Sequence, residues 1–268
     1  MNTPTKIVTI VALIISGLSS AMAEPVDTEL IILIDVSGNI ENSVFEEQKQ
    51  AYVDSFRSSA VIDAISKGRN KSIAVSMVLF AGNSQQYTAV EWMTIRDSAS
   101  ANAFATAVED ATAPFTGRNA LGEALGYASK QFGHETGNAG NGYESLYQVI
   151  QITGNTKDNA TGPRVRDRGV NVARARDEAV ADGVDRIDGI HSDKYDNDLE
   201  GYFQQHVVIG EGSNMESHEI GKSLSPLLEK QLVSEIIGGT GAAVPEPSST
   251  LLIGIGAACF LIRRERDQ

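Results

Sequence analysis

The chain has 268 residues and carries 35 acidic against 22 basic side chains, a formal net charge of −13 at pH 7. A phosphate backbone repels such a charge, so we expect no nucleic acid among the partners. Hydrophobic residues make up 41% of the chain, which is typical of a globular protein and excludes a disordered one. The single cysteine, Cys259, excludes an intrachain disulfide.

Residues 1–23 have the order of a secretory signal peptide. Lys6 precedes an apolar run from Ile7 to Leu18, and the small residues Ala21-Met22-Ala23 follow. The alternative is an uncleaved anchor, but the apolar run is shorter than the roughly 20 residues that span a bilayer. We therefore expect cleavage after Ala23 and export of the mature protein.

Strands and helices are expected to alternate along residues 24–238. The run from Glu29 to Ile34 is continuously apolar after its first residue, as in a central strand covered on both faces. A helix with one apolar face is predicted at 43–56. Further strands are predicted at 72–80, 147–152, 183–190 and 206–209, with an edge strand near Tyr87 and Trp92, and further helices around 104–108 and at 121–132, 170–181, 199–204 and 217–237. This order predicts a single α/β domain with a doubly wound, mostly parallel sheet and helices on both faces.

The C-terminus has three parts after a linker at 239–244. Pro245-Glu246-Pro247 comes first, an apolar stretch from Leu251 to Ile262 follows, and a basic cluster begins at Arg263. This order resembles a PEP-CTERM sorting signal over 245–268. The resemblance implies removal of the tail by an exosortase in a Gram-negative bacterium, after a transient association with the membrane. A plain C-terminal anchor is the alternative, which would have the same topology without the Pro-Glu-Pro motif.

The segment Asp35-Val36-Ser37-Gly38-Asn39 follows the first strand, at the kind of edge where open α/β sheets bind ligands. It resembles the Asp-x-Ser-x-Ser motif of von Willebrand factor type A domains, whose fold is Rossmann-like. The resemblance is to a bacterial branch of unknown function and covers roughly residues 27–238. The other segments that carry it are 114–122, 149–155, 175–183 and 201–203.

This resemblance implies a degenerate metal-ion-dependent adhesion site. Asp35 and Ser37 match the family, whereas Asn39, Asn119 and Asn155 stand where it has a serine, a threonine and an aspartate. With Asp35 as the only carboxylate, we expect weak binding of Mg²⁺ or Ca²⁺, or none. Two alternatives remain open. Thr116 and Asp158 could shift into the site, or the aspartate and the asparagines could bond to one another and to loop backbones.

Together these features predict a non-enzymatic binding or adhesion module of the cell envelope, cell surface or extracellular matrix. Its expected ligand is an extracellular protein or polysaccharide. An exported hydrolase acting on surface polymer is one alternative, which would require two opposed carboxylates in a cleft. A structural surface protein with a vestigial site is another.

Overall fold

The computed structural model describes residues 23–38, 40–133, 140–162, 168–192, 198–219 and 222–240. Its strands are β1 (Glu24–Pro25), β2 (Thr28–Asp35), β3 (Ile73–Phe80), β4 (Gln86–Ile95), β5 (Tyr143–Glu144), β6 (Gln148–Gly154), β7 (Arg186–Ser192) and β8 (Met215–His218). Its helices are α1 (Asn42–Phe56), α2 (Ser59–Ser66), α3 (Ser98–Asp110), α4 (Leu121–Ser129), α5 (Arg168–Ala181), α6 (Leu199–His206) and α7 (Ser225–Gly239). In these ranges, no helix combines the length and the apolar character needed to cross a membrane.

The main sheet has six strands in the order β4-β3-β2-β6-β7-β8, and β1 and β5 form a separate parallel pair. The edge strand β4 is antiparallel to β3, while the other neighbours in the main sheet are parallel. The chain builds outward from β2 through β3 and β4, and then in the opposite direction through β6. The carboxyl ends of β2 and β6 therefore border the point where the strand order reverses, and the predicted doubly wound sheet is confirmed.

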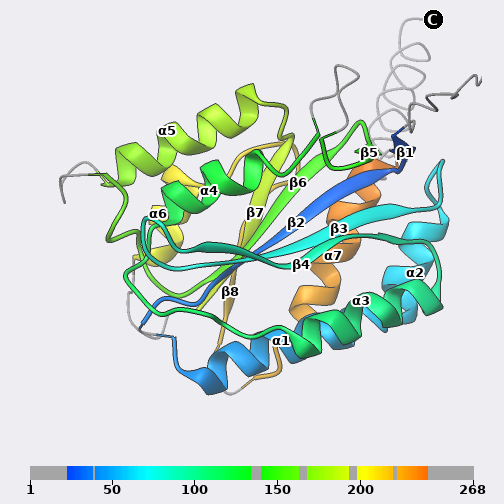
Figure 1. Ribbon diagram of the computed structural model, residues 1–268, viewed down its shortest axis with the longest axis horizontal. Helices are drawn as coiled ribbons and strands as arrows, with labels where there is room; N and C mark the ends of the chain where they lie inside the picture. Colours follow the sequence, from blue (N-terminus) through cyan, green and yellow to red (C-terminus); the bar gives the residue numbers. More distant parts are fainter. Residues whose placement is uncertain are drawn as a thin grey trace, which may run out of the picture.

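Helices cover both faces of this sheet (Figure 1). Helices α1, α2, α3 and α7 lie on one face, and α4, α5 and α6 lie on the other. The position of β2 between the two layers of helices explains why its sequence is continuously apolar. Leu30, Ile32 and Ile34 pack toward the α1 face, whereas Ile31 and Leu33 pack toward the α4 face. Each of these fully buried side chains contributes roughly 1.5 to 3 kcal/mol to folding.

The prediction of a strand at 206–209 is wrong. Helix α6 extends to His206, and the backbone N–H groups of Val207 and Val208 both donate to the carbonyl oxygen of Phe203. Ile209 forms only an isolated antiparallel bridge with Ile187. These bonds continue α6 and leave the N–H groups of Val207 and Val208 unable to pair with a neighbouring strand.

The helix predicted at 217–237 is wrong in its first part. Residues Met215–His218 form β8, which lies parallel to β7, and α7 begins only at Ser225. Pro226 sits in the first turn of α7, where its missing N–H leaves no helical bond unmade. This proline was a local signal that could have placed the start of the helix.

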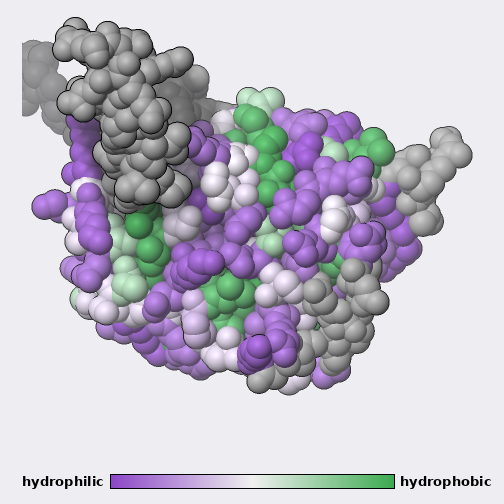
Figure 2. All heavy atoms as spheres, turned by 180° about the vertical axis from the view of Figure 1, so that it is seen from behind, coloured by the Kyte–Doolittle hydropathy of each residue, from purple (hydrophilic) through white to green (hydrophobic). Residues whose placement is uncertain are grey.

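Seen from behind, the described surface is mainly hydrophilic and shows separate hydrophobic spots (Figure 2). The exposed large hydrophobic side chains in the described ranges lie on different elements: Tyr87 on β4, Leu146 before β6, and Val170 and Val180 on α5. Scattered apolar side chains of this kind are ordinary on a folded surface.

Candidate functional site at the carboxyl edge of the sheet

Asp35 is the last residue of β2, and its side chain is fully buried at the carboxyl edge. The backbone N–H of Ser37 donates to Oδ1 at 2.8 Å, and Nδ2 of Asn119 donates to Oδ2 at 2.6 Å. Burial raises the pKa of the Asp35 carboxyl to about 6, although the hydrogen bonds from Ser37 and Asn119 oppose this rise. The structure thus surrounds this carboxyl group with hydrogen-bond donors.

Asn119, just before α4, joins three loops through its side chain. Besides Asp35, its Nδ2 contacts Oγ1 of Thr156 at 3.2 Å, and its Oδ1 accepts a bond from the backbone N–H of Leu121 at 3.1 Å. The amide oxygen therefore faces the start of α4, and the NH₂ group faces Asp35. In this arrangement Asn119 is a donor to the carboxylate and not an oxygen ligand.

Asn155 follows β6 and is also buried. Its Oδ1 has no hydrogen-bond partner in the described part of the chain. The third loop nevertheless reaches the site, since a Cβ placed on Gly154 would lie 3.7 Å from Cβ of Asp35. The structure thus brings Asp35, Asn119 and the Asn155 loop together at one edge.

The first loop contributes Ser37, whose buried side chain also bonds to Asp35. Asn39 lies outside the described residues. Thr116 approaches from the loop before α4, because a Cβ placed on Gly38 would lie only 3.1 Å from Oγ1 of Thr116. The N–H of Gly38 donates to the carbonyl oxygen of Gly117 at 2.6 Å, which holds these two loops together.

Asp158 serves a different purpose from the ligand role considered above. Its Oδ1 accepts bonds from the N–H groups of Ala160 and Thr161, and its Oδ2 accepts from the N–H of Gly122 and the hydroxyl of Thr161. The carboxylate therefore ties the loop after β6 to the first turn of α4. Its charge reaches Asp35 only as a minor repulsion that raises the pKa of Asp35.

The donor set fits a tightly held divalent cation poorly. Mg²⁺ requires near-octahedral oxygen ligands, and carboxylates supply most of the protein's charge at such sites. Here Asp35 is the only carboxylate of the cluster, and Asn119 turns N–H groups toward it. Within the described ranges, no group of three or more His, Cys, Asp or Glu side chains could hold a metal ion.

Two members of this cluster were not anticipated. Thr156 contacts Asn119, and Oδ1 of Asn159 accepts a bond from the backbone N–H of Asn119 at 3.0 Å. The run from Asn155 to Asn159 contains two asparagines, a threonine and an aspartate, which favour turns and side-chain bonds to backbone. That composition was the signal available in the sequence.

The fold is that of von Willebrand factor type A domains. Three similar solved structures each match 81% of this chain at low identity, which establishes the fold. The first is proximal thread matrix protein 1 from the mussel byssus with a zinc-occupied MIDAS motif (16% identity, 49% of that chain, TM-score 0.56). The second is a von Willebrand factor type A protein from Catenulispora acidiphila (14% identity, 43% of that chain, TM-score 0.50). The third is the pilus adhesin SpaC from Lactobacillus rhamnosus GG (13% identity, 30% of that chain, TM-score 0.55). The chain spans about half or less of the length of these neighbours.

Residues 25–240 match the family described as protein of unknown function (DUF1194), and the chain belongs to this family. Residues 243–266 match the PEP-CTERM protein-sorting motif, which marks an exported, surface-directed protein and implies processing by an exosortase. No curated protein matches the sequence. The predicted resemblance to a von Willebrand factor A-like domain with this sorting signal is confirmed.

Proposed function

We propose that this protein is an exported, non-enzymatic binding module that attaches to an extracellular protein or polysaccharide through the carboxyl-edge loops of its sheet. The observation that carries the proposal is the buried cluster of Asp35, Asn119 and Asn155 at the reversal point of a von Willebrand factor A fold. A byssus matrix protein and a pilus adhesin with this fold support an adhesive role. In this proposal a divalent cation contributes little to ligand binding, because the hydrogen bonds from Ser37 and Asn119 already satisfy the Asp35 carboxylate.

The placement of the tail supports this function. The end of α7 lies against the start of β2, since a Cβ placed on Gly239 would meet Oγ1 of Thr28. Asp35 is at the other end of this eight-residue strand, which is about 25 Å away at the usual rise per residue. The last described residues before the sorting tail therefore lie at the edge of the sheet opposite the cluster, so the carboxyl-edge loops stay free while the tail is still attached.

The maturation that we propose follows the two terminal signals. Residues 1–23 are removed on export, and 24–238 form the binding domain. Residues 239–244 link this domain to the tail at 245–268, which an exosortase-type enzyme removes after a transient stay in the membrane of a Gram-negative bacterium.

The hydrolase alternative gains no support from the carboxyl groups that meet in the described structure. Asp188 of β7 and Glu235 of α7 interact, but both are fully buried between the sheet and α7. A substrate polymer would have to displace the helix to reach them. A binding role is therefore favoured over this alternative.

The experiment compares how much of the protein remains in the extracellular matrix of the producing cells and how much is free in the medium. We expect Asp35→Ala and Asn119→Ala to lower the retained fraction several-fold while export continues. Asp63→Ala is the matched control, because it removes an exposed carboxylate from α2, next to the opposite edge of the sheet. Equal retention of all these forms would contradict the proposal.

A further inference from the structure

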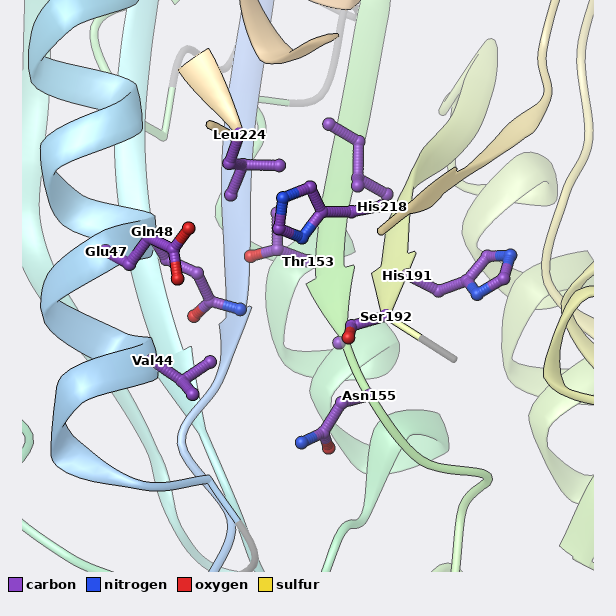
Figure 3. Close-up of a pocket in the computed structure, with 11 residues that line it drawn as sticks. Val44, Glu47, Gln48, Thr153, Asn155, His191, Ser192, His218 and Leu224 are labelled. Carbon is purple, nitrogen blue, oxygen red and sulfur yellow. The ribbon is translucent and has the colours of Figure 1, made fainter. Parts of the chain in front are cut away.

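A small cavity lies beside the cluster, between α1 and the carboxyl ends of β6 and β7 (Figure 3). Its volume is about 60 Å³. Asn155 belongs to both places, because it lines the cavity and directly follows Gly154, where an added Cβ would lie 3.7 Å from Cβ of Asp35. The walls are formed by the apolar side chains Val44, Ile190 and Leu224. The cavity is thus an apolar recess at the edge to which we assign binding.

Several polar groups are directed into this recess. Figure 3 shows Gln48 of α1, Thr153 of β6 and His218 of β8 extending toward the same space from three sides. Gln48 and Asn155 are buried, and neither Oε1 of Gln48 nor Oδ1 of Asn155 has a hydrogen-bond partner in the described structure. A buried oxygen without a partner is destabilising, so an occupant that donates hydrogen bonds would be favoured here.

The charges around the cavity are negative. Glu47 carries an exposed carboxylate at its lining, and no Lys or Arg is found among the described lining residues. The Glu47 carboxylate at the lining therefore favours a cationic occupant.

The size of the cavity limits the shape of the occupant. An apolar cavity that binds benzene has a volume of about 150 Å³, and this recess is less than half as large, so it is too small for aromatic and sugar rings. We propose that it binds the end of a primary alkylammonium group, such as the side chain of a lysine on a partner protein; a free aliphatic amine has the same chemistry. This proposal rests on the proposed function, to which it adds a second anchor beside Asp35.

The first test titrates the purified full chain with n-butylammonium, n-butanol and tetramethylammonium at constant ionic strength and in the presence of chelator. Nuclear magnetic resonance follows the amides of β6, β7 and α1. We expect saturable, millimolar binding of n-butylammonium, binding of n-butanol at least about threefold weaker, and none for tetramethylammonium, which is too bulky. Equal binding of amine and alcohol, or no saturable binding, would overturn the proposal.

Variants assign the binding to the cavity. Thr153→Val keeps the shape and removes the hydroxyl, and Glu47→Gln removes the lining charge; each should weaken n-butylammonium about threefold or more. Glu46→Gln is the control, since it removes the same charge at the neighbouring position, which does not line the cavity. A loss of affinity in the control alone would place the amine elsewhere and refute the site.

Two further ligands separate the possible sources of the amine. Tighter binding of Nα-acetyl-lysine amide than of Nα-acetyl-norleucine amide would assign the site to a lysine side chain, whereas binding of putrescine without the lysine derivative would assign it to free amines. Because chelator is present and no matrix is involved, failure here leaves the retention experiment on Asp35 untouched. Conversely, amine binding that Thr153→Val weakens would establish the site even if retention does not depend on Asp35.

Discussion

The charge of one residue, Asp35, decides the chemistry of the candidate site. A buried carboxylate needs either a cation or hydrogen-bond donors, and here Ser37 and Asn119 supply donors. An asparagine in place of a threonine thus does more than change ligand geometry, because its NH₂ group satisfies the oxygen that a metal would otherwise contact.

The first prediction concerns the position of the missing second carboxylate. Asn155→Asp places a second negative charge near Asp35, because a Cβ placed on the preceding residue, Gly154, would lie 3.7 Å from Cβ of Asp35. In the presence of chelator, we expect the free energy of unfolding of the variant to be roughly 1 to 3 kcal/mol lower than that of the native chain, because like charges repel in a buried site. Millimolar Mg²⁺ should restore most of this loss, since a ligand that binds the folded state stabilises it.

Thermal and denaturant unfolding with and without Mg²⁺ measure this effect. Asn102→Asp adds the same charge on an exposed position of α3 and should respond to neither treatment. Native protein should barely respond to Mg²⁺. A large shift of the native melting curve by micromolar Mg²⁺ would show that the amides do not weaken the site.

At the scale of elements, helix α7 rests on the sheet through a polar contact. Glu235 of α7 meets Asp188 of β7, and Nε of Arg186 donates to Asp188 at 2.5 Å. Burial, and then the neighbouring Asp188, raises the pKa of the Glu235 carboxyl well above its usual 4.5. The protonated form of Glu235 therefore favours the packing of α7, the helix that precedes the sorting tail, against β7.

The second prediction follows from this proton. The folded state keeps it, whereas the unfolded chain releases it above about pH 4.5, so this contribution is complete below that pH and is lost as the pH rises. Glu235→Gln imitates the protonated acid and has no such dependence. The unfolding constant of the native chain, relative to the variant, should increase about tenfold for each pH unit until the folded pKa is reached.

Denaturant unfolding of both forms at several pH values between about 5 and 7 measures this ratio. The other groups that face Glu235 are Arg186 and Asp188 on β7 and Tyr52 on α1, and they are the same in both forms. Glu229→Gln on α7 is the control, because it removes a carboxyl group that is not fully buried. A pH-independent ratio for Glu235→Gln would mean that Glu235 is ionised in the folded protein.

At the scale of the whole molecule, the two edges of the sheet have different tasks. The amino edge receives the end of α7 and thus the connection to the tail, and the carboxyl edge presents the polar cluster and the cavity. A parallel sheet makes this separation possible, because its carboxyl ends all meet at the same edge. The end of α7 and the polar cluster therefore lie at opposite edges of the sheet.

The third prediction is that the mature, surface-associated protein lacks its tail. Mass spectrometry of exported protein should find no peptide that contains Arg266. Alanine at Pro245, Glu246 and Pro247 should leave the tail attached and hold the protein in the membrane, because the apolar stretch then stays in place. Recovery of intact Arg266 from native protein at the cell surface would contradict the assignment.

Local patterns predicted most of the elements, and their failures have a physical cause. The apolar run before Asp35 could only be a buried strand, and it is one. The run at 206–209 has the same apolar character, yet the N–H groups of Val207 and Val208 bond to α6, and only Ile209 bonds to β7. The stretch at 217–237 reads as one helix until Met215–His218 finds a neighbour in β7. Strand pairing of short segments depends on neighbours that are distant in sequence, which periodicity does not report.

By itself, the sequence determined the signals at both ends, the alternation of strand and helix, and the place of Asp35 after the first strand. These features are local, because they depend on composition, period and short spacings. Only the tertiary structure decided that Asn119, 84 residues away, turns its NH₂ group to Asp35, and that Gln48, Thr153 and His218 surround one recess. Such contacts are set by how whole elements pack, and a side chain's partner is then whatever group the packing leaves within hydrogen-bond reach.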